Sequence, residues 1–179
     1  MGVPYVPIVG LVGTDLLKRR DDMVIAPNPF EPSVKTVVAK SLRPDVAVFH
    51  AQMADRFGNV SFGYEVEAVM LAEASKHVIV TVERIVDHVL TEKESKGAFM
   101  PQIHVNDVVH APYGAHPAGC VGVYGPDKIH MREYVIASRD DAAFAQYVNT
   151  HVHEVANHEE YVDRFVPLEW KQTVKVSGS

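Results

Sequence analysis

The sequence predicts an α/β domain with a mainly parallel sheet flanked by helices. Two continuous apolar runs, Val46–Phe49 and Val78–Val82, are short and rich in β-branched residues, which is typical of strands buried on both faces. Between them, residues 65–77 have the periodicity of an amphipathic helix. Its apolar face is predicted to hold Val66, Val69, Met70 and Ala74. A strand, a helix and a second strand in this order are what a parallel sheet with right-handed crossovers requires.

The segment before these strands is predicted to be largely extended. Residues 3–12 are apolar but contain two prolines, which confines them to a connection or an edge strand. A short helix is expected after Thr14 or Asp15, because either side chain can cap it. Two further strands are predicted at Met23–Ala26 and Val34–Ala39, on either side of a loop with three prolines.

The remainder of the chain predicts one more strand, a loop and several helices. Residues 105–110 form a third short strand. The next residues, Ala111–Cys120, contain two prolines and two glycines, which is typical of a loop whose backbone lies close against another segment. Three helices are predicted in the last third, with caps at Asp127, at Asp140 or Asp141, and at Asn157.

Length and composition predict a single domain over residues 1–179. A chain of 179 residues that is 47% hydrophobic can build one good core. The net charge of −6 and the absence of a run of Lys or Arg argue against a nucleic-acid or membrane surface as partner. The single cysteine, Cys120, excludes an internal disulfide, and no apolar segment approaches the ~20 residues that span a bilayer. We therefore expect a cytoplasmic protein.

Polar residues gather where the two predicted buried strands end. His50, Asp55 and Asn59 follow the first strand, and Glu83 ends the second. In an open parallel sheet, ligands collect beyond the carboxyl ends of the strands, so these residues are candidates for a site. The alternative is structural, with His50 and Asp55 bonding loop backbone groups and Glu83 capping the next helix.

The loop after the third predicted strand contains two more candidates, Gly114 and His116, which either contact a ligand or form a tight structural turn. A nucleophilic triad is not predicted, since Ser61, Ser75 and Cys120 lie outside any Gly-x-Ser-x-Gly elbow and have no neighbouring base. Neither of the usual glycine-rich phosphate-binding loops is present in the sequence.

Three histidines, His151, His153 and His158, lie close together near the C-terminus. Helical zinc pairs usually stand at positions i and i+4, and none of these three shows that spacing. The pattern therefore favours surface histidines and no metal site.

Several motifs spread over the chain are specific enough to indicate a family. They are Gly2–Pro7 (GVPYVP), Gly13–Leu17 (GTDLL), Arg43–Ala47 (RPDVA) with His50-Ala51, Ala54-Asp55 and Gly58-Asn59, Val80–Glu83 (VTVE), and Val108-Val109 with Ala111–Pro117 (APYGAHP). With these motifs the chain resembles the C-terminal half of the A (alpha) subunit of family I coenzyme A transferases. The resemblance is greatest to the glutaconate CoA-transferase branch and to the related ring-opening CoA hydrolases of steroid degradation.

The resemblance implies a NagB/RpiA/CoA-transferase-like α/β fold, incomplete relative to the full family domain. It also implies an active site between A and B subunits, where a glutamate attacks an acyl-CoA thioester and becomes a glutamyl-CoA thioester through an anhydride. That glutamate belongs to the B subunit in the glutaconate branch, and to the N-terminal half of the A subunit in the hydrolases. We therefore expect no catalytic residue in this chain, no cofactor, and coenzyme A as a substrate.

In such an enzyme, the chain would line the acyl and interface side of the pocket. The residues expected there are His50, Asp55, Asn59, Glu83, Gly114 and His116. The partners would be the missing N-terminal half of the A subunit together with a B subunit, and the isolated chain would be inactive. The substrates would be an acyl-CoA and a small carboxylate such as a dicarboxylate.

Two alternatives stay open from the sequence. The chain could belong to a ring-cleaving CoA-thioester hydrolase, or it could be a non-catalytic remnant that stabilises a partner. The loop at residues 28–33 lacks the Thr-Gly that commonly follows Pro-Phe in the family, so the substrate contacts of that loop do not transfer to this chain.

Overall fold

The computed structural model of the chain describes residues 3–63, 66–95 and 97–171. The chain divides into two compact units, Met1–Asp45 and Val46–Ser179, which are described separately. The single domain over residues 1–179 stays a prediction. Across the described residues, no helix combines the length and the apolar character needed to cross a bilayer.

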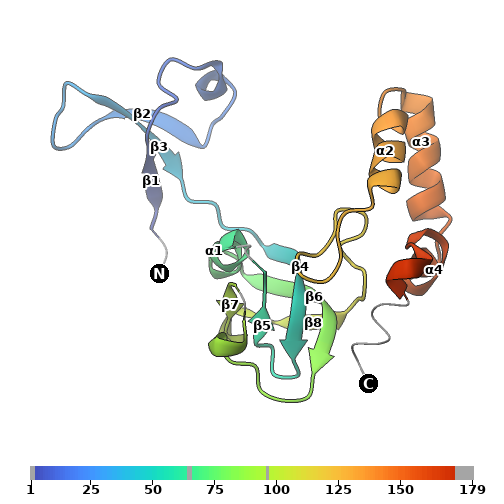
Figure 1. The fold of residues 1–179 in the computed structure, drawn as a ribbon. Helices are drawn as coiled ribbons and strands as arrows, with labels where there is room; N and C mark the ends of the chain where they lie inside the picture. Colours follow the sequence, from blue (N-terminus) through green and yellow to red (C-terminus); the bar gives the residue numbers. More distant parts are fainter. Residues whose placement is uncertain (1–2, 64–65, 96, 172–179) are drawn as a thin grey trace. The chain divides into compact units, whose positions relative to one another are not determined.

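The first unit is a three-stranded antiparallel sheet in the order β1-β3-β2, drawn in blue tones in Figure 1. Its strands are β1 (Tyr5–Ile8), β2 (Met23–Pro27) and β3 (Lys35–Lys40). Because β1 lies at an edge, Pro7 breaks no ladder in the sheet centre, and the predicted edge position is confirmed. The expected helix after Thr14 is a single 3₁₀ turn, η1 (Asp15–Lys18).

The second unit contains a five-stranded mixed sheet in the order β7-β5-β4-β6-β8. Its strands are β4 (Val46–Asp55), β5 (Val60–Ser61), β6 (His77–Val86), β7 (Phe99–Met100) and β8 (Asp107–His110). The pairs β4–β6 and β6–β8 are parallel, whereas β5 pairs antiparallel with β4 and β7. The α/β class predicted from the sequence is confirmed, and a short turn joins the antiparallel strands β4 and β5.

Strands β4 and β6 continue well beyond the apolar runs that predict them. The sequence places their ends near Phe49 and Val82, but β4 runs to Asp55 and β6 runs to Val86. His50 lies directly opposite Thr81 in the parallel ladder, inside both strands. The prediction that polar residues mark the strand ends is therefore wrong for His50 and Glu83, which lie inside the strands and bond each other across the ladder, whereas Asp55 is the last residue of β4.

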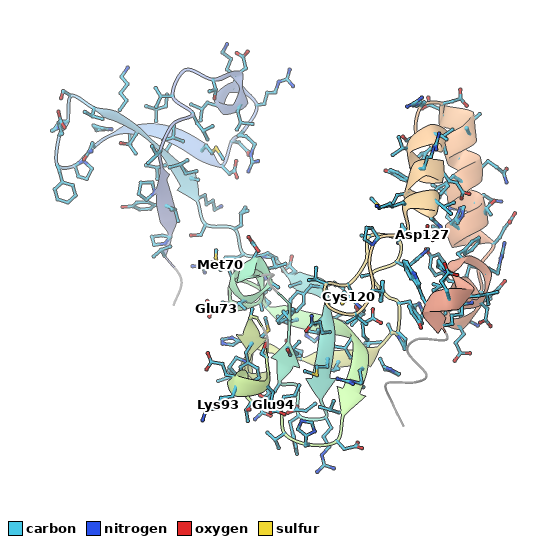
Figure 2. All side chains as sticks on the ribbon, viewed as in Figure 1. Met70, Glu73, Lys93, Glu94, Cys120 and Asp127 are labelled. Atoms are coloured by element: carbon cyan, nitrogen blue, oxygen red, sulfur yellow. The ribbon has the colours of Figure 1, made fainter. Side chains whose placement is uncertain are left out.

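Helix α1 (Val66–Ala74) follows β5 and packs on the sheet, as predicted. Among the side chains of α1 that are described, from Glu67 on, the buried ones are Ala68 and Ala72, four residues apart, whereas Met70 (labelled in Figure 2) is 66% exposed. The predicted apolar face is therefore wrong at Met70 and Ala74, which are exposed, while Val69 is half-buried and the side chain of Val66 lies outside those described. Small alanines let the helix backbone approach a core whose buried members include Val60, Phe62, Val78, Val80, Val82 and Met100.

The remaining helices are α2 (Lys128–Ala137), α3 (Asp141–Val148) and α4 (His158–Phe165). A π-helical turn, η4 (Asn149–His153), continues α3, and α2 packs against α3. Two 3₁₀ turns, η2 (Glu92–Glu94) and η3 (Gln102–His104), lie between the strands. The predicted caps are confirmed, because the side chains of Asp127, Asp140 and Asn157 each accept a backbone N–H of the helix that follows.

Candidate functional site

The buried carboxylate of Glu83 on β6 is the centre of a polar network in the second unit. The residue is 9% exposed. Its Oε1 lies 2.6 Å from Nε2 of His50 and accepts a 2.5 Å hydrogen bond from the hydroxyl of Tyr124. Its Oε2 accepts a 2.7 Å hydrogen bond from the backbone N–H of Tyr113. Both oxygens of a carboxylate withdrawn from water are thus satisfied, as burial of a charge requires.

Two adjacent parallel strands supply the floor of this network. His50 and Gln52 alternate on one face of β4, and Thr81 and Glu83 alternate on β6. Nδ1 of His50 lies 2.8 Å from the hydroxyl of Thr81, so both ring nitrogens of this histidine have partners. The side-chain amide of Gln52 donates to the carbonyl of Val121. The strands therefore present a row of polar side chains to the loop that lies on them.

The loop at residues 111–126 is the second half of the site. Gly114 lies so close to the strands that an added Cβ would be 2.8 Å from Cε1 of His50 and from the carbonyl oxygen of Ala111. Tyr113 adopts a positive φ of 61°, which directs its N–H towards Glu83. The predicted close approach of this loop to another segment is confirmed, and the approach is to His50.

Tyr124 closes the network from the far end of the same loop. Its hydroxyl donates to Glu83 and accepts a 3.1 Å hydrogen bond from the N–H of Ala115. Burial, together with the neighbouring Glu83 carboxylate, raises the pKa of the Tyr124 phenol. The phenol therefore stays protonated and remains a donor. Tyr124 also lines an open hollow of about 390 Å³, together with residues 118, 119, 121–123, 125 and 126.

Asp55 and Asn59 form a separate turn at the end of β4. Asp55 is fully buried, accepts N–H bonds from Phe57, Asn59 and Leu90, and accepts a further bond from the Asn59 side chain. Burial would raise the pKa of Asp55, but the bonds from Asn59, Leu90 and Phe57 outweigh it and lower the pKa. Asp55 lies five positions beyond His50, about 16 Å along β4. Asp55 and Asn59 therefore brace the β4–β5 turn.

His116 belongs to a third group, between the loop and the helices. Its side chain is fully buried, with Nδ1 2.8 Å from the hydroxyl of Tyr161 on α4 and Nε2 3.2 Å from Oδ2 of Asp127. Burial raises the pKa of Tyr161 to about 12. Since Asp127 also caps α2, His116 ties the loop to two helices.

Of the six predicted site residues, the structure brings together His50, Glu83 and Gly114. The sequence did not identify Thr81, Tyr113 or Tyr124 as their partners. The alternation His-x-Gln in one strand and Thr-x-Glu in the next was the available signal, because in-register parallel strands place alternate residues on one face. The two tyrosines carry no such signal, since their roles depend on the path of the loop.

The network suits positioning better than nucleophilic attack. A carboxylate that attacks a thioester needs a free oxygen facing the substrate, but both oxygens of Glu83 already accept hydrogen bonds. Cys120 (Figure 2) lies in the same loop, and its thiol is within 4.8 Å of ligand-type atoms of His50 and Glu83. The arrangement fixes the loop on the strands and so shapes the hollow beside Tyr124.

Comparison with protein families finds a match to the coenzyme A transferase family over residues 11–111. The A subunit of glutaconate CoA-transferase from Acidaminococcus fermentans is 30% identical, over 92% of this chain and 56% of the relative. The A subunit of 3-oxoadipate CoA-transferase from Pseudomonas knackmussii is 32% identical, over 89% and 56%. The cholesterol ring-cleaving hydrolase IpdA subunit of Rhodococcus jostii is 27% identical, over 84% and 54%. The chain thus spans about half the length of these relatives.

Solved structures agree with this comparison. The crystal structure of glutaconate coenzyme A-transferase from Acidaminococcus fermentans superimposes with a TM-score of 0.82 at 30% identity, over 92% of this chain and 57% of that one. A variant of the decarboxylase AibA/AibB superimposes with a TM-score of 0.68 at 27% identity, over 85% and 55%. The match to these structures extends through both units of the chain.

Gly114→Ala tests the close approach of the loop to His50. We expect a loss of about 1–3 kcal/mol in the free energy of unfolding, because the new methyl group overlaps the imidazole and the Ala111 carbonyl. Urea unfolding measures the loss. Gly125→Ala in the same loop is the control, because a Cβ there meets no atom within 4 Å. Equal stability of the two variants would contradict the close packing.

Asp55→Asn tests the charge at the β4–β5 turn. Because its pKa is lower in the folded chain, ionised Asp55 stabilises the fold above its unfolded pKa of about 4, and this contribution is lost as the pH falls through the folded pKa. We expect the variant to be less stable by about 2 kcal/mol at neutral pH and the difference to shrink in acid. Urea unfolding across the pH range measures this.

Asp87→Asn is the matched control for that series, since Asp87 is exposed in the segment that follows β6. We expect it to change the free energy of unfolding little at any pH. A stability difference between wild type and Asp55→Asn that grows on acidification would contradict the assigned role of the carboxylate.

Proposed function

The chain belongs to the coenzyme A transferase family, and we propose that it forms part of the A subunit of an enzyme that moves coenzyme A between an acyl-CoA and a small carboxylate. The observation that carries this proposal is the structural agreement with glutaconate coenzyme A-transferase over nearly the whole chain. Two relatives are named as A subunits of transferases for glutaconate and 3-oxoadipate, both dicarboxylates. We therefore propose a dicarboxylic acyl group as substrate.

We propose that the polar network gives this chain a supporting role in the reaction. In the proposed exchange, a glutamate carboxylate bonds to the acyl carbon of the thioester, the carbon–sulfur bond breaks, and coenzyme A leaves as a thiolate. That thiolate then attacks the resulting anhydride at the glutamyl carbon, which releases the acyl group as a carboxylate and leaves a glutamyl-CoA thioester. The acceptor carboxylate then takes up coenzyme A by the same two steps in reverse, which frees the glutamate. Glu83 is buried and bonded through both oxygens, so we propose that the attacking glutamate comes from a partner B subunit.

The hollow beside Tyr124 is the surface that we propose for part of the thioester. Glycines and apolar side chains line it along residues 118–126, which allows a narrow, uncharged chain to lie close to the backbone. Glu83 and Gln52, which lie on the strands, hold this loop in place through hydrogen bonds to Tyr124 and Val121. The network would thus set the shape of the wall against which the substrate lies.

The names of the relatives and the cysteine content of the chain support proposals for its partner, its cofactor requirement and its compartment. The relatives are named as A subunits, so we propose that the partner is a B subunit, that coenzyme A is a substrate, and that no cofactor is bound. We also propose that the enzyme is cytoplasmic, since a chain with one cysteine suits a reducing compartment. Asp55, Asn59 and His116 would support the site by bracing its surroundings.

A second candidate function is hydrolysis of a ring-containing CoA thioester. The similarity to the cholesterol ring-cleaving hydrolase IpdA subunit favours it. The lower identity of that relative ranks hydrolysis behind transfer.

The test is reconstitution followed by product analysis. The chain is co-expressed with the segment of an A subunit that the match does not cover and with a candidate B subunit. The complex is then incubated with glutaconyl-CoA and acetate. We expect acetyl-CoA and free glutaconate in equal amounts. Free coenzyme A without acetyl-CoA would instead indicate hydrolysis, and a lack of turnover with any complement would indicate a non-catalytic partner.

Tyr124→Phe in the reconstituted complex tests the role of the network. The variant keeps the ring that lines the hollow but removes the donor to Glu83, so we expect kcat/KM for transfer to fall roughly 10-fold. Tyr134→Phe on α2, where the ring is 46% exposed, is the matched control and should retain full activity. Equal activity of both variants would contradict a positioning role for Tyr124.

A further inference from the structure

A second group of ligand-type side chains lies between α2 and the π-helical turn η4. It consists of His130 and Glu133 from α2 and His151 from η4. One ligand atom of each residue lies within 4.8 Å of the ligand atoms of the other two. The imidazole rings of the two histidines meet edge to face, with centroids 4.7 Å apart. The proposed transferase chemistry makes no use of this group.

Local structure explains why these residues meet. The Asp127 cap starts α2 so that His130 and Glu133, three positions apart, lie on the same face of the helix. After α3, the chain makes a π turn in which the N–H of Glu154 bonds to the carbonyl of Asn149 at 2.9 Å. This turn contains His151, and π turns inside helices are frequent at functional sites.

Tyr147 on α3 bonds both histidines and so determines which ring nitrogens remain available. Its backbone carbonyl lies 2.9 Å from Nδ1 of His151, and a carbonyl only accepts, so this nitrogen carries the proton and Nε2 keeps a lone pair. Its hydroxyl lies 2.7 Å from Nε2 of His130. When that hydroxyl accepts, Nδ1 of His130 keeps the lone pair. Metal-binding histidines usually donate their second N–H to such partners.

Glu133 completes the set with a carboxylate. Its side chain is exposed at the surface of α2 and forms no hydrogen bond or ion pair with another described residue. The His50–Glu83 pair is the opposite case, since hydrogen bonds use all of its nitrogen and oxygen atoms. Three groups with available lone pairs therefore converge on one point beside α2.

We propose that His130, Glu133 and His151 form a binding site for a divalent metal ion of the zinc type. Two imidazoles and one carboxylate suit zinc, and three protein ligands leave a fourth position for water. Ligands of a tetrahedral zinc ion lie about 3.4 Å apart. The three ligand atoms lie within 4.8 Å of one another, so small side-chain movements would bring them to that spacing.

The bound ion would join two helices that have little core of their own. His130 is the one buried residue within α2, and α3, which is described throughout, has none. A metal ion held by α2 and η4 replaces part of the missing packing, because binding free energy then adds to the stability of the folded pair.

Isothermal titration of the chelator-treated chain with Zn²⁺ tests the proposal. We expect one equivalent to bind, and His151→Ala and Glu133→Gln to weaken binding at least 10-fold. His153→Ala is the control, because His153 lies in the same turn, is exposed and is outside the cluster. Titration with Co²⁺ should give the visible absorption bands of a low-symmetry site, and both ligand variants should lose them.

Three results would overturn the site. One is the absence of saturable Zn²⁺ binding to the wild-type chain. Another is equal binding by wild type, Glu133→Gln and His151→Ala. The third is loss of binding in Cys120→Ser, which would assign the ion to the His50–Glu83–Cys120 group. Thermal melting without metal checks that the variants fold, and a Zn²⁺-dependent rise in Tm should occur in wild type and in His153→Ala.

Discussion

The burial of the Glu83 carboxylate is the constraint on which the second unit depends. An ionised carboxylate withdrawn from water must be compensated by donors, and here one partner comes from the neighbouring strand and two come from one loop. The loop at residues 111–126 therefore cannot leave the strands without exposing Glu83 or leaving its charge unpaired. Gly114 fits because any Cβ would overlap the His50 ring, and Tyr113 takes a left-handed backbone conformation so that its N–H faces the carboxylate. This shared requirement explains why the APYGAHP motif accompanies the VTVE motif in the sequence.

Features that depend on local sequence pattern could be predicted from the sequence. Features that depend on contacts between distant residues could not. The apolar runs at residues 46–49 and 78–82 locate β4 and β6, and Asp127, Asp140 and Asn157 mark helix starts, because periodicity and capping are local. The predicted ends of β4 and β6 are too early, because the polar residues that follow the apolar runs bond one another across the ladder and the strands continue. The face of α1 is wrong at Met70 and Ala74, which are exposed, because the helix packs through Ala68 and Ala72 instead.

For the site, spacing alone could not separate Asp55 and Asn59, which brace a turn, from Glu83, which anchors a loop. Each is a polar residue near a strand end, and only the partners distinguish them. Likewise His151 was expected on the surface because its spacing to His153 and His158 fits no metal pair. Its actual neighbours, His130 and Glu133, come from another helix, where sequence separation carries no information about distance.

The chain contains two groups of histidine and glutamate that differ in their capacity to bind a ligand, and hydrogen bonding accounts for the difference. In the first, His50 and Glu83 bond each other, and Thr81, Tyr113 and Tyr124 bond the remaining nitrogen and oxygen atoms, so every polar atom of the pair already has a partner within the fold. In the second, Tyr147 bonds one ring nitrogen of His130 and one of His151, and the other ring nitrogen of each histidine stays available beside Glu133. A ligand site therefore follows from which lone pairs remain unused once the fold has satisfied its own needs.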